Sequence, residues 1–506
     1  MANSVVEPEL ELVPNSVTPQ GSLPPLRYRD LPEPSKLRHM IGPGIILAGL
    51  SLGSGEFVLW PYITYKSQFV FFWACMLGLI TQYFINMEIT RWTLATGETA
   101  IGGFCRLSKH WAWVFLIANI VPHMIPAWSK GAAELLSWLI WNPDLAAAPD
   151  DRYVTPLAIG GMFLCGAILT AGPVIYQTVE KIQMALVSLI LVLVVIIAFA
   201  VVRADAIEAQ FTATATLGYP NFVPELTEQF TSVFLLGALA FAGCGGTLNL
   251  TQSNYIRDKG YGMGKFIGRM TSPVTGQEEP IATTGYLFHT NEDNMRRWRS
   301  WWRLASAEHF LSFFCTCAFC LITLTLITYS LLYTSEGVLR PEAASLGEDM
   351  SFIRGEAREL SNILGPWARV TFIVMGIAIL LTTEFGILDA ASRVSTDIIK
   401  VNWLRDNDRW TESRIYYTCL WTTIVFGTGV LLIGQERVEG SALGLFKLTS
   451  SISGGVMCLY SATLLALNFY SLPRPLRMTW YRVAIMIWAV LFFGFFAVWA
   501  GWSVLG

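Results

Sequence analysis

Long apolar runs separated by short polar segments occupy most of the chain after residue 40. Each run approaches or exceeds the about 20 apolar residues that a helix needs to cross a lipid bilayer. The pattern predicts eleven membrane-spanning helices, at 41–63, 69–92, 111–141, 154–173, 178–202, 230–256, 306–334, 366–398, 415–434, 441–470 and 479–504. The predicted fold class is therefore an all-α polytopic membrane protein.

Composition excludes a soluble protein. Hydrophobic residues make up 53% of the 506 positions and charged residues 14%, whereas soluble domains carry about 25% charged residues. Residues 1–38 differ from the rest, because they are polar and proline-bearing, and they are predicted to form a disordered tail. This tail has no apolar core of the kind found in secretory signal peptides. The nine cysteines lie mostly in apolar runs and suggest no disulfide framework.

The distribution of Lys and Arg predicts the orientation. Most basic residues fall in segments that share one side of the membrane if the predicted helices alternate, so the positive-inside rule gives a cytoplasmic N-terminus and an external C-terminus. The predicted cytoplasmic loop 257–305 ends in alternating Arg and Trp at 296–303, a pattern that suits a lipid interface better than nucleic acid. The predicted external loop 335–365 is acidic.

The first apolar run is interrupted at its centre. Gly53 and Gly55 flank Ser54, and each glycine weakens a helix by about 1 kcal/mol relative to alanine. Glu56 follows at membrane depth, where an ionisable side chain marks a functional site by default. We therefore predict a helix that is broken in mid-membrane, with Glu56 and the freed backbone groups facing a substrate.

The sixth run repeats this signature. Gly243, Gly245 and Gly246 interrupt it, and the polar side chains of Thr247 and Asn249 follow. Close helix packing is the alternative reading of either cluster alone. Two glycine-interrupted spans in corresponding places instead indicate a transport site. The predicted substrate-binding residues are Gly53, Ser54, Gly55, Glu56, Gly245, Gly246, Thr247 and Asn249.

Each interrupted span opens a set of five predicted helices, and an odd number inverts the second set relative to the first. The sequence thus predicts a five-plus-five inverted repeat with broken helices 1 and 6 and an extra C-terminal helix. The predicted segments are a first repeat at 39–203, an external loop at 204–229, a second repeat at 230–473 and an eleventh helix within 474–506.

Four further ionisable residues are candidates for ion or proton coupling. Lys130 and Glu134 are spaced to pair on one helix face, as part of an ion path or as a structural ion pair. His123 is a possible proton carrier, or it lies at the membrane edge, and Glu384 falls deep within its run. No Walker A, nucleophile-elbow or zinc-protease motif is present, so neither an ATP-driven pump nor an enzyme is expected, and no cofactor.

Several short segments resemble one transporter family. They are Gly-Pro-Gly at 42–44, Lys-Ser-Gln-Phe at 66–69, Ala-Thr-Gly-Glu at 95–98, Ala-Glu at 133–134 and Glu-Lys-Ile at 180–182. In these segments the chain is similar to the natural-resistance-associated macrophage protein (Nramp) family. The resemblance implies the eleven-helix form of the leucine-transporter-type fold, alternating access and proton-linked uptake of divalent metal, in a bacterial plasma membrane.

The chain departs from this family at the metal site. The family's Asp-Pro-Gly-Asn motif corresponds to Gly53–Glu56, and its Met-Pro-His-Asn motif corresponds to Gly246–Asn249, so the aspartate, thioether and imidazole ligands are replaced. Glu56 and Asn249 are the predicted metal ligands. Oxygen ligands suit a hard cation such as Mg or Mn, whereas methionine selects softer metals.

Three functions remain open from the sequence. The first is a secondary transporter of a cation, coupled to an ion or proton. The second is a transporter of a small organic solute or anion, in which half-helix N–H groups hold a carboxylate and Glu56 holds an amine or a proton. The third is a membrane sensor or structural protein that does not transport. Besides its solute, the expected partner is the lipid bilayer, and no nucleic-acid partner is expected.

Overall fold

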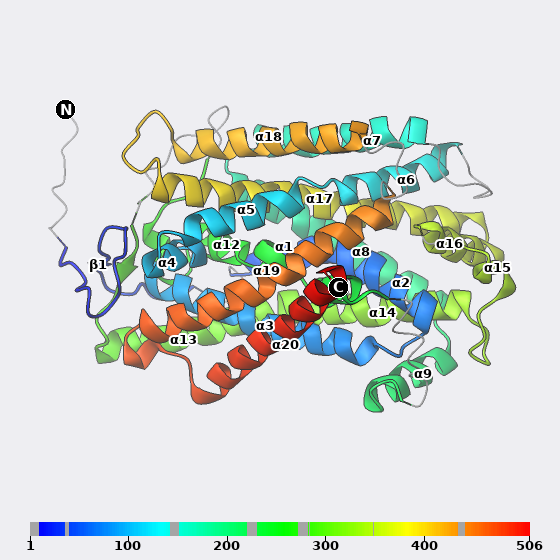
Figure 1. Cartoon of the computed structure of the whole chain (residues 1–506), viewed down its shortest axis with the longest axis horizontal. Helices are drawn as coiled ribbons and strands as arrows, with labels where there is room; N and C mark the ends of the chain where they lie inside the picture. The colour runs from blue at the N-terminus through cyan, green and yellow to red at the C-terminus, as the bar shows by residue number, and fades with distance from the viewer. Residues whose placement is uncertain are drawn as a thin grey trace.

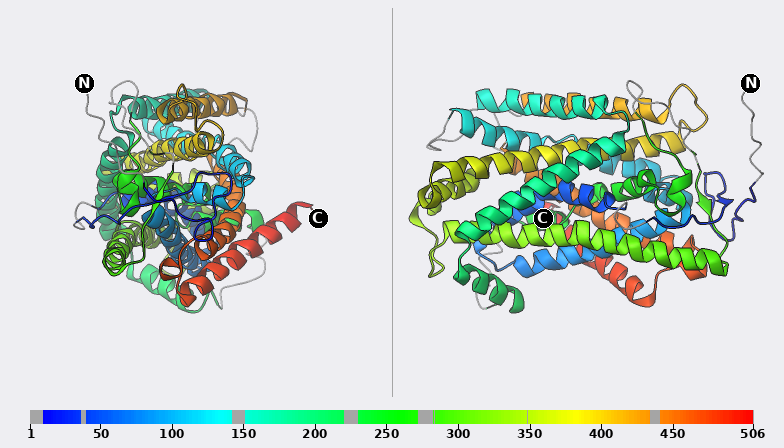
Figure 2. Two further views of the ribbon diagram at one scale, coloured as in Figure 1. Left: turned by 90° about the vertical axis from the view of Figure 1, so that its left-hand side faces the viewer. Right: turned by 180° about the vertical axis from the view of Figure 1, so that it is seen from behind.

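A computed structural model describes residues 10–35, 40–141, 151–219, 230–271, 282, 284–347, 349–433 and 441–505. The long helices lie side by side, with their axes close to the longest dimension of the molecule (Figure 1). The same bundle is seen from the end and from behind in Figure 2. In the described residues, strand structure is limited to β1 (Arg27–Tyr28) and β2 (Tyr286–Leu287), which pair in parallel.

The elements up to the second break are helical apart from β1. They are α1 (Pro43–Ser51), η2 (Leu52–Leu59), α2 (Trp60–Ser67), α3 (Phe72–Thr96), α4 (Ala100–Leu107), α5 (Trp111–His123), α6 (Ala127–Trp141), α7 (Asp151–Ala171), α8 (Ile175–Val201), α9 (Ala204–Ala215) and α11 (Ser232–Ala240). Of these, η2 is a π-helix.

The remaining helical elements run from the second break to the end of the chain. They are η3 (Gly246–Leu248), α12 (Thr251–Lys259), η4 (Gly262–Phe266), α13 (Glu292–His309), η5 (Phe310–Phe314), α14 (Cys315–Leu332), α15 (Pro341–Ala344), α16 (Ser351–Leu364), α17 (Pro366–Asn402), α18 (Glu412–Ile433), α19 (Ala442–Tyr470), η8 (Arg474–Leu476) and α20 (Trp480–Leu505).

Nine helical runs in the described residues are long and apolar enough to cross a membrane. They are Pro43–Ser67, Trp111–Trp141, Arg152–Ala171, Ile175–Val201, Glu292–Leu332, Pro366–Asn402, Glu412–Ile433, Ala442–Tyr470 and Trp480–Trp502. All nine coincide with predicted spans. The outer faces of these runs are apolar, as on Phe199 of α8 (89% exposed) and Leu491 of α20 (64% exposed), so the chain is an integral membrane protein.

The other two predicted spans do not meet this criterion of length and hydropathy. The run predicted at 69–92 is the 25-residue helix α3, whose hydropathy is lowered by Gln82, Asn86 and Glu88. The run predicted at 230–256 is divided into α11 and α12, each of nine residues, with η3 between them. Polar side chains and glycines thus account for both differences.

Residues 10–35 do not have the predicted disorder. The side chains of Val13, Leu26 and Leu31 are buried, and β1 pairs with β2. Helix α13 holds this segment by its backbone, because Trp301 Nε1 donates to Pro32 O (2.7 Å) and Arg297 Nη1 donates to Leu31 O (2.8 Å). The prediction of disorder was wrong because it rested on the average polarity of the segment, which does not show that a few side chains are buried.

A buried ionic network joins α12, the helix that follows the second break, to α17 and α18. Arg393 of α17 donates from Nε to both carboxylate oxygens of Asp389 (2.8 Å each) and from Nη1 to Asp258 of α12. The hydroxyls of Tyr255 (3.1 Å) and Tyr416 (2.7 Å) also donate to Asp389. Buried charges persist only when they are paired and hydrogen-bonded, so this network fixes α12 against α17 and α18.

Replacing Arg393 with Gln is expected to destabilise the fold strongly. Removal of Arg393 leaves Asp389 as a buried carboxylate with no cation beside it among the described residues, and it leaves Asp258 with Arg257 alone (3.3 Å). Breaking a buried ion pair in this way costs about 3–5 kcal/mol. The apparent melting temperature of the detergent-purified protein should therefore fall by several degrees. Arg414→Gln, at an exposed position of α18, is the charge-matched control and should melt as the unmodified chain does. Equal melting temperatures for both variants would contradict the role of the network.

Candidate functional site

The first predicted break is a widened helix rather than an unwound gap. Helix α1 ends at Ser51, the π-helix η2 follows over eight residues, and α2 begins at Trp60. A π-helix places residues five positions apart on adjacent turns. Ser51 and Glu56 have this spacing, and the Ser51 hydroxyl donates a hydrogen bond to Glu56 Oε1. The interruption of α-helical hydrogen bonding is therefore stabilised by this pair.

Two glycines of η2 allow close approach of neighbouring backbone and side chains. The N–H of Gly53 donates to Thr383 Oγ1 of α17 (3.0 Å), and Thr383 donates in turn to Gly49 O (3.0 Å). A Cβ atom on Gly55 would overlap the carbonyl oxygen of Phe241, the residue that follows α11. The first break thus rests directly on the backbone of the second break.

Glu56 is fully buried beside this contact. Its Oε1 accepts the Ser51 hydrogen bond, and its Oε2 has no hydrogen-bond partner among the described residues. The Cys317 side chain of α14 lies close to this carboxylate. A buried carboxylate oxygen without a partner is costly, so Oε2 is the atom of this site that gains most from a bound cation or proton.

The second predicted break is a true interruption of the helix. Gly246 has a φ of +65° and packs against Ser453 of α19, which a side chain at this position would prevent. The carbonyls freed at the end of α11 find side-chain donors: Trp60 Nε1 donates to Ala238 O (3.0 Å), and Gln82 Nε2 donates to Ala240 O (2.7 Å). Side chains of α2 and α3 therefore satisfy the interrupted backbone.

The polar residues of the second break are held by other helices. Asn249 Nδ2 donates to the hydroxyl of Tyr460 (2.9 Å) and to Gln82 Oε1 (3.3 Å), while Asn249 Oδ1 has no partner among the described residues. Thr247 Oγ1 donates to Asn119 Oδ1 of α5 (2.9 Å). Asn249 and Glu56 thus have different hydrogen-bond partners. The described residues contain no group of three or more His, Cys, Asp or Glu side chains that could hold a metal ion.

A polar ladder between α3 and α12 extends from Asn249. Gln82 and Thr90, two turns apart on α3, accept hydrogen bonds from Asn249 and Gln252 respectively. Asn86 lies midway between them and is fully buried, and neither of its polar atoms has a partner among the described residues. Gln82, Asn86 and Thr90 are spaced at i, i+4 and i+8. In the sequence, this spacing is the signal that one face of α3 is polar.

His309 ends the ladder in an unexpected place. His309 stands near the start of the span predicted at 306–334, which favours an interfacial position, whereas its side chain is 1% exposed and its Nδ1 lies 3.2 Å from Gln252 Nε2. Its ring stacks on Phe313 and Tyr83, with centroid distances of 4.8 Å and 5.6 Å. Position along the run alone did not reveal this burial.

Two of the predicted coupling residues lie on α6. Both Lys130 and Glu134 are buried. Glu134 Oε1 accepts a hydrogen bond from the N–H of Ala442 (3.1 Å), at the first residue of α19. A carboxylate is favourable at this position, because it satisfies a free N–H and faces the positive end of the helix dipole. The Lys130–Glu134 pair itself stays a prediction.

The other two predicted coupling residues each neighbour a break. His123 Nδ1 lies 2.6 Å from Asn119 O, and Asn119 also holds Thr247 of the second break. Glu384 lies close to the backbone of Ser129 and follows Thr383, the residue that holds the first break. All four predicted coupling residues are therefore buried in the bundle. His123 contacts Asn119, which binds the second break, and Glu384 is adjacent in sequence to Thr383, which binds the first break.

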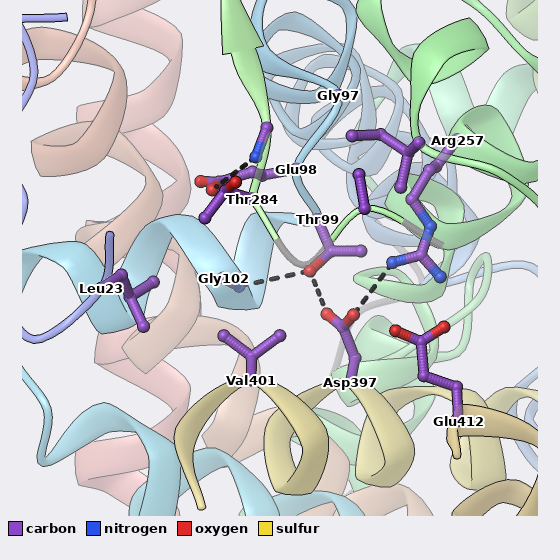
Figure 3. A pocket seen from close by; sticks show the side chains of 13 residues that line it. Leu23, Gly97, Glu98, Thr99, Gly102, Arg257, Thr284, Asp397, Val401 and Glu412 are labelled. Carbon is purple, nitrogen blue, oxygen red and sulfur yellow. Dashed lines mark hydrogen bonds and ion pairs between the residues drawn. The ribbon is translucent and has the colours of Figure 1, made fainter. Parts of the chain in front are cut away.

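A small cavity at the end of the bundle is not the predicted site. It measures about 30 Å³ and is lined by charged side chains of several helices (Figure 3). Asp397 is bound to Arg257 (2.9 Å) and Thr99, and Glu98 is bound to Arg106 (2.6 Å). These ion pairs connect α4, α12 and α17 to one another. Glu412 also lines the cavity, and its Oε2 has no hydrogen-bond partner among the described residues.

Gly55→Ala is expected to disrupt the contact between the breaks. The added Cβ meets a backbone oxygen, which cannot rotate away, and overpacking of this kind costs about 1–3 kcal/mol. A lower apparent melting temperature should result. Gly160→Ala is the control, because the added Cβ meets no atom within 4 Å apart from its chain neighbours and the backbone of its own helix. The substitution should be neutral or stabilising by about 0.5–1 kcal/mol. A Gly55→Ala protein as stable as the control would refute the close approach.

Comparison with solved structures identifies the fold. The manganese transporter of Eremococcus coleocola, in complex with an aromatic bis-isothiourea substituted compound, matches with a TM-score of 0.61 and 13% identity, over 97% of this chain and 90% of that chain. A mutant of the same transporter matches with a TM-score of 0.62 and 13% identity, over 98% and 91%. No family profile and no curated protein matches the sequence. The chain therefore has the fold of this manganese transporter along nearly its full length, which confirms the resemblance to the Nramp family at the level of structure.

Proposed function

We propose that the protein is a secondary active transporter that binds its solute where the two breaks meet. The observation that carries this proposal is the contact of Gly55 with the Phe241 carbonyl, beside the buried carboxylate of Glu56. Non-helical backbone at membrane depth is tolerated where it is buried in protein or lines a cavity. All eight predicted substrate-binding residues are buried, so a solute reaches them only when the surrounding helices move, as alternating access requires.

The inverted repeat is the architecture we propose for this movement. Helix α3 and the α11–α12 pair serve as the two additional spans, which gives eleven spans in total, with repeats at 39–203 and 230–473. The N-terminal segment and α13 lie at one end of the bundle, and α15 and α16 lie at the other (Figure 1). This separation supports a cytoplasmic N-terminus with loop 257–305, and external positions for 204–229 and 335–365. The C-terminus lies midway along the bundle in Figure 1, so its proposed external position rests on the alternation of the spans alone.

A cation is the substrate class that the site favours. Glu56 offers a carboxylate oxygen and Asn249 offers an amide oxygen, neither of which has a hydrogen-bond partner in the part of the chain that the structure describes. Together with the Ser54 hydroxyl and backbone carbonyls, they form a set of oxygen ligands that suits a hard cation such as Mg or Mn. Bringing Glu56 and Asn249 onto one ion requires rearrangement around Gln82, which now holds Asn249.

A small organic solute is the second candidate. One observation favours it: the described residues hold no group of three acidic, histidine or cysteine ligands. A single carboxylate balances one positive charge, which fits an amine better than a divalent ion. In this case Glu56 binds the amine, and the N–H groups of Gly245 and Gly246 hold a carboxylate of the solute.

Glu56→Gln is expected to abolish cation transport. Glutamine keeps the size of the side chain and an acceptor for the Ser51 hydroxyl but removes the negative charge. Uptake of Mn²⁺ and Mg²⁺ into liposomes that contain the purified protein should fall at least about tenfold, because loss of even an outer-shell partner of a metal ligand costs about 10–100-fold.

Glu356→Gln is the matched control, because Glu356 is a buried carboxylate of α16 outside both breaks. It should transport normally. Normal uptake by Glu56→Gln would remove Glu56 from the mechanism. If neither metal ion moves but an amine-bearing organic solute does, and this flux is lost in Glu56→Gln, the second candidate replaces the first.

Glu134→Gln is expected to uncouple transport from protons. The amide oxygen of Gln can still accept the Ala442 N–H bond, so the cap of α19 is preserved, whereas the side chain can no longer take up a proton. A pH gradient imposed on the liposomes should stimulate uptake by the unmodified chain but not by this variant. Equal stimulation of both proteins would exclude Glu134 as a coupling group.

A further inference from the structure

Helix α13 carries a stripe of exposed arginines. Arg296, Arg299 and Arg303 are exposed and share one face at i, i+3 and i+7. Arg296 is paired with Asp293 (3.3 Å). Arg299 and Arg303 have no carboxylate partner within the described part of the chain. The stripe therefore presents two guanidinium groups without a counter-charge.

This stripe continues directly into the membrane. Helix α13 runs without interruption through η5 into α14, and Glu292–Leu332 is one candidate span. The exposed apolar residues Phe310 (44%) and Leu311 (57%) follow Arg303 by about two helical turns, or roughly 10 Å. The arginines thus lie just outside the apolar layer, at the depth of lipid headgroups.

A second basic segment lies at the same end of the bundle (Figure 1). Arg474 is exposed and Arg477 is half-buried, and both lie before α20 and lack a carboxylate partner in the described ranges. Two aromatic residues begin α20, with Trp480 82% exposed and Tyr481 44% exposed. Exposed Trp and Tyr at the end of a membrane span are typical of the interface with water.

Trp302 connects the two basic segments. Its ring lies 4.1 Å from the guanidinium of Arg91 and 4.8 Å from that of Arg482. Arg91 Nη1 also donates to Leu476 O (3.1 Å), in the segment that holds Arg474 and Arg477. Glu88 pairs with both inner arginines, at 2.6 Å from Arg91 and 2.8 Å from Arg482. The single carboxylate of Glu88 therefore pairs with Arg91 and Arg482. It does not neutralise the four arginines nearer the surface, which are Arg299, Arg303, Arg474 and Arg477.

We propose that Arg299, Arg303, Arg474 and Arg477, with Trp480 beside them, form a binding site for the phosphate headgroup of an anionic phospholipid. Unpaired like charges on one surface repel each other and attract an anion. The guanidinium fork matches the oxygens of a phosphate group. A basic cluster next to a membrane span attracts anionic lipids, and a zwitterionic lipid supplies no net charge to balance four arginines.

The test compares lipid binding by charge-matched variants of the full-length protein. Purified protein in detergent is titrated with phosphatidylglycerol or phosphatidylcholine, and retained lipid is measured by native mass spectrometry. The unmodified chain should bind phosphatidylglycerol in preference to phosphatidylcholine. Arg299→Gln/Arg303→Gln should weaken phosphatidylglycerol binding about 30-fold. Arg409→Gln/Arg414→Gln, with the same loss of charge at exposed positions of another segment, should not change it.

Several results would overturn the proposal. These are equal binding of the two lipids, equal loss in both double variants, or displacement of the lipid by equimolar inorganic phosphate or by a DNA oligonucleotide. The four substitutions are at exposed positions, and unchanged melting temperatures would verify folding. Trp480→Ala, which leaves every arginine in place, should also weaken phosphatidylglycerol binding. Unchanged binding by this variant would mean that charge alone attracts the lipid, and it would contradict a site that includes Trp480. None of these results depends on which solute the protein transports.

Discussion

The close approach of two interrupted helices is the constraint on which the rest of the bundle depends. Gly55 lies against the carbonyl of Phe241 at a distance that no side chain would permit. Around this contact, the interrupted backbone has to find hydrogen-bond partners away from water. Thr383 supplies them on one side, and Trp60 and Gln82 supply them on the other. Helices α2, α3 and α17 are positioned by this requirement.

The same contact determines the chemistry available to a solute. Glu56 is the fully buried carboxylate at the first break, and its Oε2 has no hydrogen-bond partner in the described segments. Asn249 brings an amide oxygen from the second break, but Gln82 and Tyr460 hold its nitrogen. A solute that binds both breaks has to compete with these hydrogen bonds. In the proposed alternating-access mechanism, binding and helix movement would thereby be linked.

The sequence was informative where residues violated the pattern of their surroundings. Gly53, Gly55 and Glu56 stand out in an apolar run, and so do the glycines before Asn249, which is why both breaks and the fold could be predicted. The form of the first break could not be predicted. The π-helix depends on the hydrogen bond between Ser51 and Glu56 and on Thr383, a residue more than 300 positions away. Burial of His309 likewise depends on stacking with Tyr83, which no local pattern encodes.

Substrate protection of the cysteines around Glu56 would test the central claim most directly. Cys317 contacts the carboxylate from α14, and Cys244 lies within the second break. Variants that retain only one of these two cysteines can be labelled in liposomes with a membrane-impermeant thiol reagent. If the solute binds where the breaks meet, labelling of both residues should slow in the presence of the transported solute and not in the presence of an untransported one. Labelling rates that the transported solute leaves unchanged would contradict a binding site between the two breaks.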